Sequence, residues 1–256
     1  MKRFERTRIW LSENGVLWTL MYQARLTLGR LAERLDRQLR RREEQYGLPG
    51  TNPVKLNLRK WETYDWSKAG EEWTESEAWK QALVTDVMAK HIQPSGTILE
   101  IGPGAGRWTE FLQKRAGRLL LADLSPKCIE LCRERFSECS NIEYHVTDGS
   151  RLEFIRDGSV DSIWSFDVFV HIGPPETEKY IAEFARILKP GGRGLVHHPR
   201  EGGGPDGFRS SMTARLFAEM TERHGMKVVG QITRWGGNNE FNLERFRDVV
   251  TVFEKP

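Results

Sequence analysis

Two periodicities alternate along the chain from about residue 76 to its end. Short continuous apolar runs, typical of buried strands, are followed by segments with apolar residues at helical spacing. The expected strands are Thr97–Ile101, Arg118–Ala122, Ile142–Val146, Val160–Phe166, Gly194–His198, Val228–Thr233 and Asp248–Phe253. The expected helices are Ala78–His91, Trp108–Arg115, Pro126–Phe136, Glu176–Leu188 and Thr213–Gly225. This alternation predicts an α/β fold: a doubly wound, mostly parallel sheet with helices on both faces.

The first 50 residues follow a helical pattern alone. Apolar residues recur at alternating spacings of four and three and form a stripe on one helix face: Leu17, Met21, Ala24, Leu28, Leu31 and Leu35. An exposed stripe of this kind promotes aggregation, so we expect it to be covered. The cover is either a second copy of the chain, in a homodimer built on a short coiled coil, or the domain that follows. Residues 1–50 are interpreted as an amphipathic helical extension.

Residues 51–75 are less regular and concentrate large aromatic side chains. Trp61, Tyr64, Trp66 and Trp73 all lie in this segment. They either anchor the extension to the core or form a wall or lid over a ligand, and both interpretations stay open. The predicted organisation is therefore an extension over residues 1–50, a connector or lid over 51–75, and a main domain over 76–256.

Composition narrows the expected partners and compartment. Residues 1–50 hold 11 Lys or Arg against 6 Asp or Glu, whereas the whole chain has a net charge of only +3. Arg25–Arg42 could bind phosphates as a basic stripe, but the interspersed acidic residues favour a solvated helix face, which disfavours nucleic acid as a partner. Val16–Tyr22 is apolar but too short to span a membrane. Three cysteines without a pairing pattern favour free thiols in the cytoplasm.

The strongest chemical signal is a glycine-rich loop at the end of the first expected strand. Residues Ile98–Gly106 read ILEIGPGAG, so an apolar strand runs into Glu100 and then into glycines at alternate positions. Such glycines permit a tight turn and let backbone N–H groups approach a ligand closely. The fingerprint of dinucleotide-binding proteins requires a glycine where this chain has Arg107, so NAD is not the expected ligand.

Three further motifs follow along the chain. Asp123 ends the second strand, about 20 residues after Glu100, where nucleotide-binding folds place a carboxylate that accepts hydrogen bonds from ribose hydroxyls. Asp148 and Gly149 follow the third strand, where a carboxylate could accept a proton from an adenine amine. Leu188–Gly192 is interpreted as a sharp helix stop before the next strand.

In their order and spacing, these motifs resemble those of class I S-adenosylmethionine (SAM)-dependent methyltransferases of the small-molecule type. The resemblance covers roughly Ala78–Phe253. It implies a seven-stranded, Rossmann-like sheet with an antiparallel last strand, and SAM as the cofactor. It also implies a set of cofactor-binding residues: Glu100, Gly102 and Gly104 at the methionine part, Asp123 at the ribose with Leu124 against the adenine, Asp148 at the adenine amine with Gly149 beside it, and Phe166, followed by Asp167, facing cofactor and substrate.

The candidate general bases follow the fourth and fifth strands. His171 is the preferred base because its ordinary pKa lies near neutrality, and Asp167 is the second catalytic candidate. His197 and His198 are alternatives, of which only one is expected to face the site because adjacent strand residues point to opposite faces. No bound metal is expected, although these histidines and Asp167 are possible ligands.

The sequence therefore predicts an enzyme, a SAM-dependent methyltransferase that acts on a small-molecule acceptor. A hydroxyl of a sugar or of a natural-product intermediate is the preferred acceptor group. The alternatives are an N-methyltransferase of a small molecule, a nucleic-acid methyltransferase, and a SAM-binding protein without catalysis. The chain contains no Asn-Pro-Pro-Tyr-type tetrapeptide, the motif of amino methyltransferases of DNA.

Overall fold

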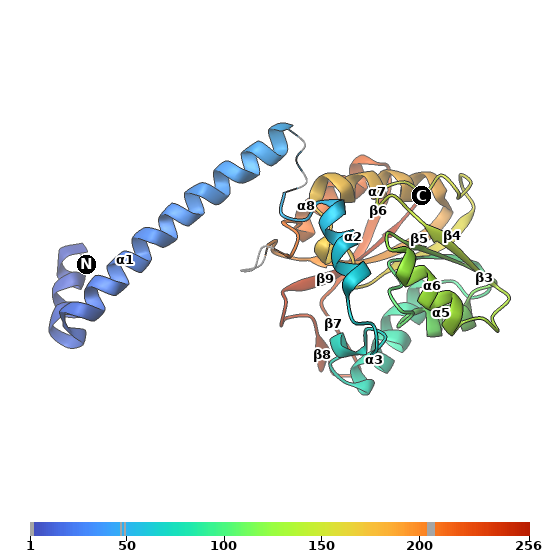
Figure 1. The fold of residues 1–256 in the computed structure, drawn as a ribbon, viewed down its shortest axis with the longest axis horizontal. Coiled ribbons are helices and arrows are strands. Elements are labelled where there is room, and N and C mark those ends of the chain that lie inside the picture. Colours follow the sequence, from blue (N-terminus) through green and yellow to red (C-terminus); the bar gives the residue numbers. More distant parts are fainter. Residues whose placement is uncertain (1–2, 47, 49, 204–207) are drawn as a thin grey trace. The chain divides into compact units, whose positions relative to one another are not determined.

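The computed structural model of the protein describes residues 3–46, 48, 50–203 and 208–256, and the chain divides into two compact units, residues 1–50 and 51–256 (Figure 1). The first unit consists of helix α1 (Arg3–Tyr46), which is broken at Gly15, where φ is 80° and ψ is 171°. Gln23 Nε2 donates a hydrogen bond to Thr7 Oγ1 at 3.0 Å. This bond holds the short segment before the break against the long segment after it.

The apolar stripe expected on the first unit lies on the helical part of α1, but it is exposed in the single chain. Leu17 is 73% exposed, Met21 and Leu28 are each 64% exposed, and Leu31 and Leu35 are about half-exposed. The helix that the spacing predicts is confirmed. Its cover by a second chain or by the main domain stays a prediction.

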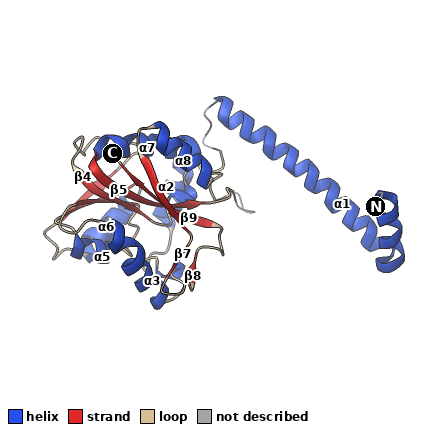
Figure 2. Cartoon of the chain, turned by 180° about the vertical axis from the view of Figure 1, so that it is seen from behind, coloured by secondary structure: helices blue, strands red, loops and turns tan. Residues whose placement is uncertain are grey.

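A seven-stranded sheet forms the centre of the second unit, in the order β3-β2-β1-β4-β5-β9-β6 (Figure 2). The strands are β1 (Thr97–Ile101), β2 (Arg118–Asp123), β3 (Ile142–Val146), β4 (Val160–Ser165), β5 (Leu188–Pro199), β6 (Lys227–Ile232) and β9 (Asp248–Glu254). Strands β3, β2, β1, β4 and β5 pair in parallel, and β9 lies antiparallel between β5 and β6. The prediction of a doubly wound, mostly parallel sheet with an antiparallel last strand is confirmed.

The two faces of the sheet bury two separate cores, because side chains alternate along each strand. Leu119 and Leu121 of β2 join one core, whereas Leu120 and Ala122 join the other. The first core includes α3 (Glu77–Leu83), α5 (Thr109–Arg115) and α6 (Pro126–Arg135), and the second includes α7 (Pro174–Ile187) and α8 (Ala214–Arg223). Helix α3 continues through a π-helical turn, η2 (Val84–Met88), into α4 (Ala89–His91). Among the described residues, no helix combines the length and apolarity needed to cross a membrane.

Several local features differ from the sequence expectations. Helix α2 (Val54–Thr63) and the 3-10 turn η1 (Glu71–Trp73) form within the connector, and β7 (Arg234–Trp235) pairs with β8 (Phe241–Asn242) in a small hairpin. The expected helix stop at Leu188–Gly192 already belongs to β5. It is extended because Leu188 pairs with β4 and the N–H of Gly191 donates to the carbonyl of Lys255 at 2.7 Å, contacts that no local pattern indicates.

Candidate functional site

The carboxyl ends of the parallel strands open into a pocket of about 930 Å³, its opening to solvent included. One side is lined by the residues that follow β1, β2, β3 and β4. The remaining wall consists of side chains between residues 52 and 73 and of the start of α7. Open α/β sheets bind their ligands at this edge, so the pocket is the candidate active site.

The glycine-rich loop after β1 brings bare backbone to the pocket. Gly102 has a φ of 68°, and a Cβ there would lie 2.3 Å from Cγ2 of Val168. Gly104 has a φ of 58°, and a Cβ there would lie 2.7 Å from the ring of Trp66. Both the left-handed backbone and the close packing require glycine. Glycine at these positions therefore lets Val168 and Trp66 pack directly on the loop backbone at the edge of the pocket.

Of the two predicted carboxyl groups near this loop, one lines the pocket and the other does not. Asp123 lines the pocket, and its two oxygens accept hydrogen bonds from the N–H of Gly104 at 3.3 Å and of Ser125 at 2.8 Å. Burial raises the pKa of Asp123 to about 6. Glu100 is buried and is not a lining residue; its Oε2 accepts a hydrogen bond from Thr109 Oγ1 at 2.6 Å, and burial raises its pKa to about 8. Asp123 thus lines the ligand pocket, whereas Glu100 is bound by the first residue of α5.

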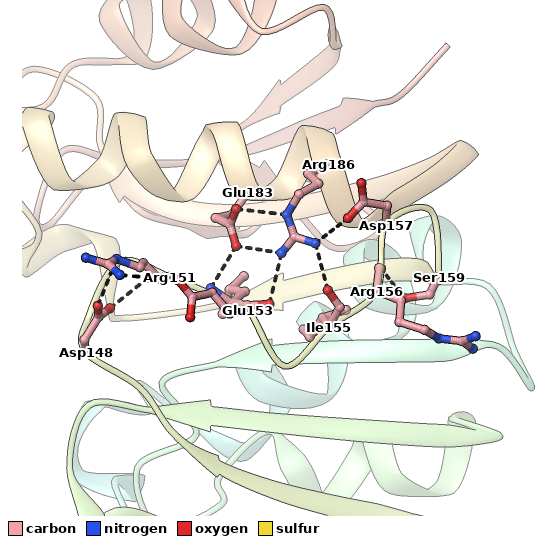
Figure 3. A network of polar contacts seen from close by, with 10 residues as sticks. Asp148, Arg151, Glu153, Ile155, Arg156, Asp157, Ser159, Glu183 and Arg186 are labelled. Carbon is pink, nitrogen blue, oxygen red and sulfur yellow. Dashed lines mark hydrogen bonds and ion pairs between the residues drawn. The ribbon is translucent and has the colours of Figure 1, made fainter.

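The turn after β3 contributes Gly149 to the pocket lining, but not Asp148. Asp148 Oδ1 accepts hydrogen bonds from the N–H groups of Ser150 and Arg151, both at 2.9 Å, and the Arg151 guanidinium lies 3.4 Å from Oδ2 (Figure 3). Partial burial raises the pKa of Asp148, but these N–H donors outweigh it and leave the pKa below its ordinary value. Arg186 braces the same loop through the carbonyls of residues 152 and 155. The carboxylate of Asp148 therefore stabilises its own turn.

Phe166 and Asp167 both line the pocket just beyond β4. Asp167 has a φ of 62°, a left-handed conformation that is strained for a residue with a side chain. Its carboxylate forms an ion pair with Arg107 and lies 3.1 Å from Nδ1 of His197. Burial alone would raise the pKa of Asp167, but the Arg107 charge and the His197 hydrogen bond hold it well below its usual range. Asp167 is therefore a fixed anion at the edge of the pocket.

His171 lines the pocket at the end of the 3-10 turn η3 (Phe169–His171). Its Nδ1 lies 3.2 Å from the carbonyl oxygen of Phe208, and its ring packs 5.4 Å from that of Trp61, measured between centroids. Because a carbonyl only accepts, Nδ1 carries the proton of the neutral ring and Nε2 keeps a lone pair. Burial lowers the pKa of His171 to about 4, so the imidazole is neutral near pH 7.

His197 and His198 lie on opposite faces of β5, as strand geometry predicts. His197 stacks on Phe166 with ring centroids 4.2 Å apart, and His198 stacks on Phe217 at 4.1 Å. Both histidines are buried, and neither is a lining residue of the pocket. His197 acts on the site through two lining residues: it stacks on Phe166 and helps to position Asp167.

The connector supplies the aromatic wall of the pocket. Trp61, Trp66 and Trp73 line it and pack together with ring centroids 5.8 to 6.1 Å apart. Glu62 fastens α2 to the start of α6, since its Oε1 accepts hydrogen bonds from Ser125 Oγ at 2.5 Å and from the N–H of Lys127 at 3.2 Å. The aromatic residues of the connector thus face a ligand site, while Glu62 anchors the helix that carries Trp61.

Several polar atoms in the pocket wall are buried and have no hydrogen-bond partner within the described part of the chain. They are Asn52 Oδ1 and Nδ2, Asn57 Oδ1, Arg107 Nη1, Trp108 Nε1 and Glu176 Oε2. The other amide atom of Asn57, Nδ2, donates to the carbonyl of His171 at 2.9 Å. Buried polar groups are rarely left unpaired because desolvation is costly. These atoms therefore favour a ligand that carries both donors and acceptors.

The structure brings most of the predicted site residues into one pocket: Gly102, Gly104, Asp123, Leu124, Gly149, Phe166, Asp167 and His171. Glu100 and Asp148 lie outside its lining. Sequence reasoning missed Asn52, Asn57, Arg107 and Glu176 as lining residues. Arg107 adjoins the glycine-rich loop, which could have drawn attention to it. No motif distinguishes the two asparagines of the connector.

Comparison with known proteins agrees with this arrangement. Residues 98–192 match the family model described as a methyltransferase domain. The solved structure of the N-methyltransferase NodS from Bradyrhizobium japonicum WM9, in complex with S-adenosyl-L-homocysteine, has the same fold. Its TM-score is 0.62 at 19% identity, and the match covers 79% of this chain and 98% of that chain.

Two curated relatives match over shorter stretches. The probable ribosomal RNA small subunit methyltransferase A of Methanosarcina acetivorans is 37% identical over 68 residues, which are 27% of this chain and 25% of that protein. Phosphoethanolamine N-methyltransferase 2 of Caenorhabditis elegans is 32% identical over 130 residues, 49% of this chain and 29% of that protein. The match thus spans less than a third of the length of either relative.

Proposed function

Since residues 98–192 form the methyltransferase domain of a class I SAM-dependent methyltransferase, with SAM as its cofactor, we propose that the protein methylates a hydroxyl of a small molecule with His171 as general base. The observation that carries this proposal is the neutral imidazole of His171. Its Nδ1–H is engaged by a backbone carbonyl, and its Nε2 lone pair is left for a proton from the acceptor.

The pocket fits the cofactor. The bare backbone at Gly102 and Gly104 suits its methionine part, and the Asp123 carboxylate suits two ribose hydroxyls. Leu124 and Gly149 border the space beyond Asp123, where the adenine would lie. When bound, SAM supplies a methyl group already activated by its sulfonium. The protein must then align the acceptor and exclude water, and proximity of this kind lowers a barrier by roughly 7–11 kcal/mol.

In this proposal the residues after β4 accept the proton that leaves the acceptor hydroxyl. His171 Nε2 takes the hydroxyl proton as the oxygen becomes a nucleophile, which makes the ring cationic. Burial opposes that charge, whereas the negative charge of Asp167 favours it. Asp167 is itself held in place by Arg107 and His197. His171 would thus be the catalytic base and Asp167 its electrostatic support.

The rest of the pocket suits a polar acceptor of small size. Trp61 offers a ring face beside His171. Asn57 Oδ1 and Glu176 Oε2 are buried acceptors that lack donors among the described residues. A molecule with several hydroxyl groups, such as a sugar or a hydroxylated natural product, would satisfy these acceptors with one hydroxyl left for methylation.

Methyl transfer by a His171→Asn variant tests the role of the base. With labelled SAM and a panel of hydroxylated and amino small molecules, we expect one class of hydroxyl acceptors to be methylated by the wild type. The variant should lower kcat about 10²–10⁴-fold and leave the affinity for S-adenosyl-L-homocysteine unchanged. His145→Asn is the matched control, because the His145 ring stacks on Phe154 and is not a lining residue of the pocket. Equal turnover by wild type and His171→Asn would remove His171 from the mechanism.

An amine is the second candidate acceptor group, and the similarity to a phosphoethanolamine N-methyltransferase favours it. The same panel separates the two, since amines alone would then be methylated. The match to a ribosomal RNA methyltransferase is the observation that favours a nucleic acid. Salt-dependent binding of RNA would support that alternative. Binding of SAM without transfer to any acceptor would instead favour a SAM-binding protein that lacks catalysis.

A further inference from the structure

The side chain of Asn52 is buried in the pocket wall with its whole hydrogen-bonding capacity unused. Asn52 is 3% exposed, and both its Oδ1 and its Nδ2 lack a partner within the described residues. Two residues further on, Val54 packs at the turn after β3: a Cβ at Gly149 would lie 3.2 Å from Val54 Cγ1 and 3.4 Å from Leu124 Cδ1. The segment that starts at Asn52 therefore reaches, two residues later at Val54, the end of the pocket that lies beyond β2 and β3.

That end of the pocket is where a nucleotide base is expected. A carboxylate at the end of the second strand holds the ribose in nucleotide-binding folds of this topology, and Asp123 is such a carboxylate. The base extends from the ribose, and Leu124 and Gly149 line the space next to Asp123. Asp148 is poorly placed to read this base, because its carboxylate accepts N–H groups of its own turn and is not part of the lining (Figure 3).

We propose that the side-chain amide of Asn52 recognises the adenine of the cofactor. Adenine presents an amino donor beside a ring-nitrogen acceptor, and a carboxamide presents an acceptor beside a donor, so the two match in a bidentate pair. Oδ1 would accept from the amino group and Nδ2 would donate to the ring nitrogen. This inference rests on the proposed function for the place of the ribose at Asp123, and it makes Asn52 a specificity-determining residue of the cofactor site.

The other unpaired side chains of the wall fit this role less well. Asn57 Nδ2 donates to the carbonyl of His171 at 2.9 Å and lies 3.5 Å from the backbone carbonyl of Asn52, so its donor is already engaged and only its Oδ1 is left for a ligand. Glu176 offers a carboxylate, which can accept from the amino group but cannot donate to the ring nitrogen as a carboxamide can. Asn52 alone among these side chains has a free donor and a free acceptor side by side.

The experiment compares two ligands by calorimetry: S-adenosyl-L-homocysteine and its analogue in which hydrogen replaces the 6-amino group. The wild type should prefer the amino compound by about tenfold, the effect of one buried hydrogen bond. Asn52→Leu, which keeps the side-chain size, should bind S-adenosyl-L-homocysteine more weakly and show no preference. Asn52→Asp keeps the acceptor for the amino group and should retain the preference. Asn238→Leu, at an exposed position, is the matched control and should behave as the wild type.

The ratio of the affinities for S-adenosyl-L-homocysteine and its analogue tests the assignment of Asn52. A preference that survives in Asn52→Leu, or that disappears in Asp148→Asn or Glu176→Gln instead, would overturn the assignment to Asn52. Equal binding of both ligands by the wild type would also overturn it. Failure of the wild type to bind either ligand would contradict the proposed function itself and is thus distinguishable. If Asn52→Leu does not fold, as judged by its thermal unfolding, Asn52→Ser provides the same test.

Discussion

The affinity for S-adenosyl-L-homocysteine should depend on pH through Asp123. Burial raises the pKa of this carboxyl group to about 6 in the free protein, and the negative charge of Glu62 also raises it. In the proposed site, ribose hydroxyls donate hydrogen bonds to the ionised carboxylate, so binding should favour the anion and lower the pKa of Asp123. Below pH 6 the ligand must therefore displace a proton, and the affinity falls as the pH falls.

The size of the effect follows from the ionised fraction of Asp123. With a pKa of about 6, this fraction is about 0.9 at pH 7 and about 0.1 at pH 5, so Kd should rise about tenfold, equivalent to about 1.4 kcal/mol. Titration calorimetry at both pH values measures Kd. Repeating the titration at pH 5 in two buffers of different ionisation enthalpy should reveal the release of close to one proton per ligand.

Two variants separate Asp123 from other titrating groups of the protein. Asp123→Asn cannot titrate, so its weaker affinity should be nearly the same at both pH values. Asp148→Asn should keep the wild-type slope, because the pKa of Asp148 lies below its ordinary value and outside this range. Glu100, whose pKa burial raises to about 8, is present in both variants. A flat affinity in the wild type, or an unchanged slope in Asp123→Asn, would refute the reasoning.

Two further predictions concern stability and assembly. Arg107→Met leaves the Asp167 carboxylate without the Arg107 cation and should lower the free energy of unfolding by about 3–5 kcal/mol. Arg118→Met breaks an exposed ion pair with Glu143 and should lower it by no more than about 1 kcal/mol. Chemical denaturation measures both losses, and equal losses would contradict the role of Arg107. A chain that begins at Thr51 lacks the exposed stripe of α1. By light scattering we expect the full chain to be a dimer and the shortened chain to be a monomer. The same oligomeric state for both would show that α1 is not the dimer contact.

The sheet was predictable because its signals are local. Strands β1 and β3 have the bounds that their apolar runs predict, Thr97–Ile101 and Ile142–Val146. The positions of Gly102 and Asp123 in the pocket were predictable because both residues lie at strand ends, and parallel strands bring such ends to one edge of the sheet. Helix α2 was not predicted, because its place depends on contacts such as that of Glu62 with Ser125, 63 residues away in the chain.

The placement of Asp148 shows where motif reasoning stops. An aspartate followed by glycine and serine is also the pattern of a turn in which the carboxylate caps nearby N–H groups. Asp148 does this, and the Arg151 guanidinium pairs with it. A pattern of residue types cannot decide between a carboxylate that faces a ligand and one that closes its own turn, since both need the same residue after the same strand.

The differences that matter for the acceptor lie mainly outside the family match. The matched segment, residues 98–192, supplies Gly102, Gly104 and Asp123, which we propose for the cofactor, and His171, which we propose as the base. The wall that shapes the rest of the pocket, from Asn52 to Trp73, precedes that segment. Relatives that share the matched segment can thus share SAM chemistry while presenting different walls to different acceptors. Exchanging residues 57–73, which leaves Asn52 and Val54 in place, should therefore alter acceptor choice far more than the affinity for S-adenosyl-L-homocysteine, for which we propose Asp123 and Asn52.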